Sequence, residues 1–157
     1  CSRHYFQPMY VYFHRELLKR SFAMSDETRV QVLMEEERRA QTQSFMWLFR
    51  SIEDGLPAII RCGYSPTRSG SHAKEFLEGY HGYLETDAFS GYKALEKEQT
   101  QITAAFCWAH ARRDFSDALK AVGAKSGVAI PQEGSVAAQA LANIAEIYHL
   151  EGLLKDF

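Results

Sequence analysis

The chain has 157 residues, 46% hydrophobic and 24% charged, which is enough apolar material for one domain of ordinary size and too much for a disordered chain. The formal net charge of −2 excludes a strongly basic nucleic-acid-binding module, so a DNA-binding role needs local clusters of basic residues. Three scattered cysteines argue against a disulfide framework. No apolar run reaches the length of a membrane span or resembles a signal peptide, so we expect a cytoplasmic protein with no membrane partner.

The first part of the chain predicts one helix followed by strands. Apolar residues at helical spacing predict a helix over residues 8–20. A short apolar stretch at 22–24 then leads into the polar segment Ser25–Thr28. Three later segments alternate in polarity or are rich in aromatic and apolar residues, which predicts strands over 30–34, 44–49 and 58–62. We expect these three strands to form an antiparallel meander.

Beyond residue 66 the pattern alternates between helices and strands. In chain order it predicts a helix over 71–80, a strand over 83–87, a helix over 92–97, a strand over 102–108, a helix over 109–122, a loop over 123–134 and a final helix from 135. This order predicts an α/β fold with an RNase H-like mixed sheet, in which parallel strands follow the meander, and a C-terminal helical extension.

Three regions follow from this layout. We expect an N-terminal helix and linker over residues 1–21, an incomplete RNase H-like catalytic core over 22–122, and the start of a helical insertion over 123–157.

Two aspartates are the candidate catalytic and metal-binding residues. Asp26 follows the first apolar stretch, and Asp87 ends the fourth predicted strand. Because the first and fourth strands of an RNase H-like sheet are neighbours, we expect the two carboxylates to converge. Carboxylate oxygens suit Mg²⁺ or Mn²⁺, and a two-metal site suits phosphodiester chemistry. The ordinary alternative is that each aspartate caps a turn at a strand end.

Five segments in chain order resemble the catalytic region of the insertion sequence 66 family of transposases. They are 25–33, 44–50, 65–73, 84–92 and the run Cys-Trp-Ala-His-Ala-Arg-Arg at 107–113. The resemblance covers residues 10–155. It implies that Asp26 and Asp87 are the first two members of an Asp-Asp-Glu triad, with Mg²⁺-dependent strand cleavage and joining at transposon ends. It also implies DNA (transposon ends and target) and other transposase subunits as partners, at the nucleoid of a bacterial cell.

The third acid of that triad is not evident in the sequence. In the family it lies in an Asn-Asn-x-x-Glu segment after the helical insertion, whereas this chain has one asparagine, Asn143, and ends at Phe157. We therefore expect the chain to be inactive alone. Glu151, in register with Ile144 and Ile147 on the last predicted helix, is a candidate substitute; an edge position or a contact with another helix is its more ordinary explanation.

Basic residues near the two aspartates are candidate DNA contacts. Arg68 precedes a Ser-Gly turn before a helix, where backbone N–H groups bind phosphate. Simple N-capping by Ser69 or Ser71 is the alternative for that turn. On the helix predicted over 109–122, the candidates are His110, Arg112 and Arg113, and the alternative is a solvated face with internal ion pairs. The C-x-x-H spacing of Cys107 and His110 also supplies half of a zinc site, although a structural role fits better.

Three functions remain open from the sequence. The chain is a fragment of a transposase catalytic domain, or a non-catalytic transposase remnant or interaction module, or a stand-alone RNase H-like nuclease. The last of these predicts a further acid within this chain that converges on Asp26 and Asp87.

Overall fold

The computed structural model describes residues 2–35, 37–87, 89–98, 100–126 and 134–154, and the chain divides into two compact units, Cys1–Phe106 and Cys107–Phe157. The first unit contains α1 (Ser2–Leu18), β1 (Phe22–Gln31), β2 (Gln43–Ser51), β3 (Ile60–Ser65), α2 (Gly70–Phe76), β4 (Gly82–Thr86), α3 (Ser90–Glu98) and β5 (Ile102–Phe106). The second unit contains α4 (Trp108–Ser126) and α5 (Val136–Leu154).

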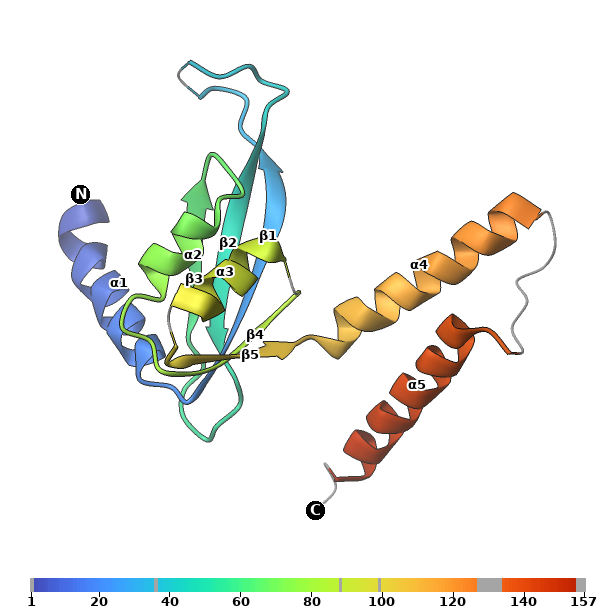
Figure 1. Ribbon diagram of the computed structural model, residues 1–157. Helices are drawn as coiled ribbons and strands as arrows, with labels where there is room; N and C mark the ends of the chain where they lie inside the picture. The colour runs from blue at the N-terminus through green and yellow to red at the C-terminus, as the bar shows by residue number, and fades with distance from the viewer. Residues whose placement is uncertain (1, 36, 88, 99, 127–133, 155–157) are drawn as a thin grey trace. The chain divides into compact units, whose positions relative to one another are not determined.

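The first unit is built on a five-stranded mixed sheet in the order β3-β2-β1-β4-β5 (Figure 1). β1, β2 and β3 pair antiparallel, while β4 pairs parallel with both β1 and β5. The meander followed by parallel strands is the predicted arrangement, and the C-terminal helices follow it. The predicted α/β, RNase H-like fold class is confirmed.

The first strand differs from its prediction. β1 is one continuous strand, Phe22–Gln31, paired with β2 along its length, whereas the sequence pattern predicted a strand over 30–34. Leu33 and Met34 lie outside the strand, and Met34 is 96% exposed. The polar run Ser25–Thr28 does not show the strand pattern, since Ser25 and Glu27 face the core side and are paired there with Tyr92 and Arg68. Asp26 consequently lies within a strand and not at its end.

One face of the sheet carries the hydrophobic core. Alternation along the strands directs Ala23, Trp47, Phe49 and Leu84 to the same face, where helices α2 and α3 lie (Figure 1). These helices and the segments beside them contribute the buried side chains Ala73, Leu77, Tyr80, Tyr92 and Leu95, and α1 contributes Leu17. The ring of Phe49 stacks on that of Phe76 at 3.7 Å between centroids. The helical face is therefore dry, and polar groups on it need partners.

Several element ends also differ from their predictions. α2 stops at Phe76, earlier than the predicted residue 80, because the chain turns at Gly79 with a φ of +78°. β5 ends at Phe106, and Trp108 begins α4 with 50% exposure instead of ending a buried strand. The predicted loop over 123–134 is shortened by α4, which reaches Ser126, and its residues 127–133 lie outside the described part of the chain.

The second unit consists of α4 and α5, which pack against each other. Ile144 is buried in this pair. Several apolar side chains of the two helices are exposed in this unit: Val122, Val136, Leu150, Leu153 and Leu154. Within the described residues, no helix combines the length and apolar character that crossing a membrane requires.

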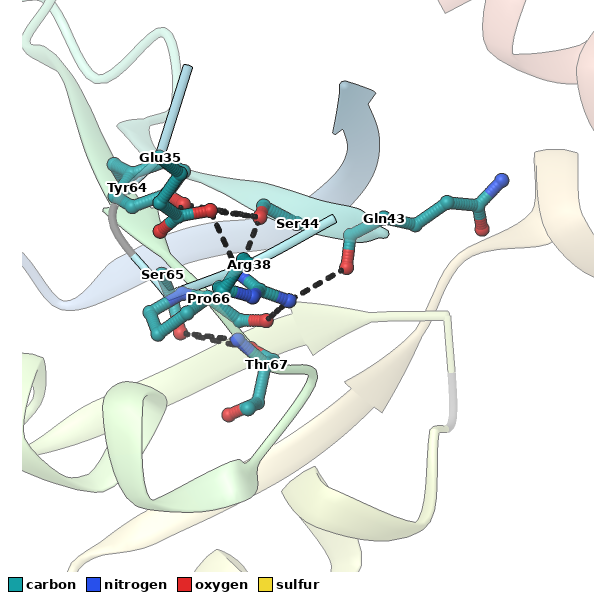
Figure 2. A network of polar contacts seen from close by, with 8 residues as sticks. All are labelled: Glu35, Arg38, Gln43, Ser44, Tyr64, Ser65, Pro66 and Thr67. Carbon is teal, nitrogen blue, oxygen red and sulfur yellow. Dashed lines mark hydrogen bonds and ion pairs between the residues drawn. The ribbon is translucent and has the colours of Figure 1, made fainter. Parts of the chain in front are cut away.

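A polar network joins the loop after β1 to the loop after β3 (Figure 2). Arg38 donates to Glu35 at 2.9 Å, to the Ser44 hydroxyl at 2.7 Å and to the Pro66 carbonyl at 2.9 Å. The hydroxyl of Tyr64 also donates to Glu35 and contacts Ser44. These contacts fix the chain immediately before residues 67–70, which lead into α2.

Candidate functional site

Asp26 and Asp87 come together at the point where β1 loses its parallel neighbour. The parallel pairing of β1 with β4 ends at Met24 and Glu85. Asp26 and Asp87 each lie two residues beyond this last pair. Residues in register on neighbouring parallel strands lie at the same level of the sheet. One carboxylate oxygen each from Asp26, Glu27 and Asp87 lies within 4.8 Å of the others, so three acids share this position.

Glu27 is an acid that the sequence analysis did not select. Its Cα lies opposite that of Trp47 in β2, so alternation directs its side chain toward the helical face, where it is 1% exposed. Burial raises the pKa of Glu27 above its ordinary value; the hydrogen bond from Arg68 opposes this shift, and the charge of Asp87 adds to it. Glu27 is thus a buried acid that depends on its partners.

Arg68 links two of the three acids. Its Nε donates to Oε1 of Glu27 at 2.6 Å, and its Nη2 contacts the same oxygen and also Oδ2 of Asp87 at 3.2 Å. The guanidinium lies over the ring of Phe89, 3.9 Å from the centroid, which is a cation–π geometry. The candidate DNA contact predicted at Arg68 is therefore an ion-pair partner of the acids in this structure.

Tyr92 supports Glu27 from the core. Its hydroxyl lies 3.1 Å from Oε2 of Glu27 and 2.8 Å from Oγ of Ser25. Burial raises the pKa of Tyr92 well above its ordinary value, so the hydroxyl keeps its proton and donates. Polar contacts therefore run without a break from Ser25 through Tyr92, Glu27 and Arg68 to Asp87.

Backbone groups fix the two aspartates. The amide of Phe89 donates to Oδ1 of Asp87 at 2.9 Å, and the amide of Glu27 donates to Oδ1 of Asp26 at 2.9 Å. Asp26 is exposed, so its carboxylate is accessible from solvent. Ser69 is the N-cap of α2, with Oγ accepting from the amide of Ser71 at 3.3 Å; the alternative explanation of the Ser-Gly turn is thereby confirmed.

The remaining candidates belong to the second unit. His110 lies half-buried in the first turn of α4, and Arg112 and Arg113 are exposed on the same helix. The two arginines line a hollow of about 660 Å³ between α4 and α5 together with Lys120 and Tyr148. Glu151 is exposed on α5. Asp26, Glu27 and Asp87 all belong to the first unit.

A metal ligand set at Cys107 and His110 is not formed among the described residues. Within that part of the chain, the one group of three or more potential ligands is Asp26, Glu27 and Asp87. Cys62 is exposed and Cys107 is half-buried, and both thiols are free. The donor set at the acid cluster is purely carboxylate, which fits a hard divalent ion such as Mg²⁺ or Mn²⁺.

Comparison with curated proteins finds two relatives from Sinorhizobium fredii (strain NBRC 101917 / NGR234). The uncharacterized protein y4jD is 30% identical over 137 residues, which are 81% of this chain and 24% of the relative. The uncharacterized protein y4hP is 43% identical over 54 residues, which are 32% of this chain and 10% of the relative. The chain thus spans a quarter or less of the length of these relatives. Comparison with solved structures gives no match.

The family comparison covers almost the whole chain. The model described as "Transposase IS66 family" matches residues 1–156, which include the acid cluster, the Arg68 turn and the Cys-Trp-Ala-His-Ala-Arg-Arg run. This extent confirms the resemblance found in the sequence. The chain belongs to the Transposase IS66 family.

Proposed function

We propose that the chain is part of the catalytic region of a DNA transposase, with metal-dependent phosphodiester cleavage and strand transfer at transposon ends as its reaction. The observation that carries this proposal is the convergence of Asp26 and Asp87, whose carboxylate oxygens lie within 4.8 Å in a group that includes Glu27. Membership of the transposase family supplies the reaction class.

Asp26 and Asp87 would hold the divalent ions. Mg²⁺ or Mn²⁺ bound there supplies activation of the attacking water or 3′-hydroxyl and stabilisation of the leaving oxygen. The chain's own part is positioning, because the amide of Phe89 fixes Oδ1 of Asp87 and the amide of Glu27 fixes Oδ1 of Asp26. Preorganised carboxylates avoid reorganisation when the reaction begins.

DNA is the proposed substrate and partner. Arg112 and Arg113, exposed on α4 beside a hollow that Lys120 also lines, are the proposed phosphate contacts of the second unit, and His110 accompanies them. Transposon ends and target DNA, together with other transposase subunits, are the proposed partners. The expected location of such a protein is the bacterial nucleoid.

A stand-alone metal-dependent nuclease is the second candidate, and one observation favours it. That function predicted a further acid within the chain near Asp26 and Asp87, and Glu27 lies there. The two candidates differ in their sequence requirement. A nuclease built from the three acids cuts a labelled duplex of any sequence, whereas a transposase requires the transposon end. A non-catalytic remnant cuts neither a duplex of arbitrary sequence nor one that carries the transposon end.

Metal binding tests the proposed site directly. We expect Mn²⁺ to bind the chain, as measured by the electron paramagnetic resonance signal of unbound Mn²⁺, and we expect Asp26→Asn and Asp87→Asn each to weaken binding by about tenfold or more. Asp114→Asn, at an exposed position on α4, makes the same charge change in the second unit and should leave binding unchanged. If Asp26→Asn and Asp87→Asn both bind Mn²⁺ with the affinity of the wild type, the proposal is overturned.

A further inference from the structure

We infer that Arg68 is the built-in counter-cation of the acid cluster and competes with a divalent ion for it, while Glu27 is a positioning residue that anchors Arg68. The inference rests on the proposed metal site and names the side chains that control its occupancy. Three carboxylates within 4.8 Å repel one another, and the guanidinium of Arg68 contacts two of them.

Glu27 is poorly placed to receive an ion from solution. Its Oε1 accepts from Nε of Arg68 and forms an ion pair with Nη2, its Oε2 accepts from the hydroxyl of Tyr92, and its side chain is 1% exposed. Both oxygens are thus occupied by donors in a dry environment. Glu27 therefore holds Arg68 in place through a charge-assisted hydrogen bond and an ion pair.

Asp87 is the acid for which an ion and Arg68 compete. Its Oδ1 accepts from the amide of Phe89, and its Oδ2 contacts Nη2 of Arg68 at 3.2 Å. A divalent ion at Oδ2 therefore meets a positive charge already in place. Asp26 is exposed and provides the approach from solvent.

The position of Arg68 is built into the fold. The Phe89 ring lies under the guanidinium, and the preceding loop is fixed by the Arg38 contact with the Pro66 carbonyl and by the Ser65 hydroxyl, which donates to the Thr67 carbonyl (Figure 2). The Arg68 side chain is nevertheless 40% exposed. The exposed part of the guanidinium is suited to a DNA phosphate once a metal ion replaces Nη2 at Asp87, while Nε stays on the buried carboxylate of Glu27.

Removing the charge of Arg68 tests this competition. We expect Arg68→Gln to tighten Mn²⁺ binding by about tenfold, since a unit charge within a few ångströms of a carboxylate changes its cation affinity by that order. The melting temperature of the variant without metal should fall below that of the wild type. Added Mn²⁺ should raise the melting temperature of the variant by more than it raises that of the wild type. Arg39→Gln, at an exposed position in the loop after β1, is the matched charge control and should change neither measurement.

A double variant keeps the test informative if the single variant unfolds, because Arg68→Gln leaves Glu27 buried without its cation. Glu27→Gln/Arg68→Gln removes both members of the pair and should also bind Mn²⁺ more tightly than the wild type. Weaker binding in the double variant than in the wild type would make Glu27 a ligand and overturn the inference. Unchanged affinity in Arg68→Gln, with Asp26→Asn and Asp87→Asn still defective, would overturn the inference alone. Absence of Mn²⁺ binding in every variant would overturn the proposed metal site as well.

Discussion

The hydroxyl of Tyr92 lies 3.1 Å from Oε2 of Glu27 and connects the hydrophobic core to the acid cluster. The same hydroxyl contacts Ser25, and the ring packs edge-on against Trp47 and Phe89. The ring and the hydroxyl therefore have separable roles, packing for one and support of a buried acid for the other.

Tyr92→Phe separates these two roles. The ring is retained, while Glu27 and Ser25 lose a buried partner, so we expect the free energy of unfolding to fall by about 1–3 kcal/mol. Urea denaturation followed by circular dichroism measures the change. Tyr83→Phe, at an exposed position in β4, should alter stability by no more than about 0.5 kcal/mol. Equal stability of the Tyr92 variant and the wild type would contradict a supporting role for the hydroxyl.

Arg20 and Asp54 should make stability depend on acid pH. Nη1 of Arg20 lies 2.6 Å from both carboxylate oxygens of Asp54, and this hydrogen bonding is the main reason why the pKa of Asp54 lies below its ordinary value. A lowered native pKa means that the unfolded chain binds the proton more readily, so the pair stabilises the fold above about pH 4 and loses this effect as the pH falls further.

The measurement for this pair is the melting temperature of wild type and Asp54→Asn between pH 7 and pH 3. We expect a gap at pH 7 that narrows toward pH 3. Glu53→Gln, at the exposed neighbouring position, should show no such gap. A gap that stays constant across the range would mean that the contact does not depend on the charge of Asp54.

Gly82 and Gly55 are glycines for different reasons. Gly82 has positive φ and no room for a side chain, whereas Gly55 has positive φ but open space around it. Both have positive φ, +149° for Gly82 and +78° for Gly55. A Cβ at Gly82 would meet the Ser21 carbonyl oxygen at 2.4 Å, whereas none of the surrounding atoms lies within 4 Å of a Cβ at Gly55. Because the first contact is with backbone, Gly82→Ala must displace the start of β1 or β4.

We therefore expect Gly55→Ala to cost about 1 kcal/mol, the strain of a left-handed alanine, and Gly82→Ala to cost about 3 kcal/mol or more. Chemical denaturation of both variants gives the comparison. Similar losses at the two positions would show that the sheet adjusts to a side chain at residue 82.

Arg38→Gln should loosen the loop after β1. Arg38 connects Glu35, Ser44 and Pro66 through short hydrogen bonds (Figure 2). We expect hydrogen exchange to accelerate in peptides from the loop between β1 and β2, while peptides from β4 and β5 keep their rates. Arg39→Gln at the neighbouring exposed position is the control. Unchanged exchange in the loop would mean that other contacts hold it.

The sequence predicted the parts of the fold that local patterning controls. The order of strands and helices and the cap of α2 at Ser69 or Ser71 follow from short-range signals, and the structure contains them. The strand predicted over 83–87 is also present, although it ends at Thr86, one residue before Asp87. β1 was misplaced because its polar residues 25–28 lack the strand pattern. Their conformation depends on the long pairing with β2.

Long-range contacts explain why part of the candidate site was not predicted. Glu27 was not selected from the sequence, since its burial depends on Arg68, 41 residues later, and on Tyr92, 65 residues later. Arg68 looked like a phosphate contact for the same reason. The sequence did contain a signal that Glu27 has a partner. In a strand, Glu27 lies on the opposite face from the exposed Asp26, and an unpaired carboxylate on the buried face would be costly.

The early end of the ladder between β1 and β4 has a mechanical consequence. The strands are joined through Phe22, Ala23 and Met24, and the chain carrying Asp87 continues beyond this joint. At the level of the two aspartates β1 and β4 are not paired, and Asp26 and Asp87 come together through their side chains. A change in the separation of these carboxylates therefore breaks no backbone pairing between β1 and β4, because that pairing ends at Met24 and Glu85.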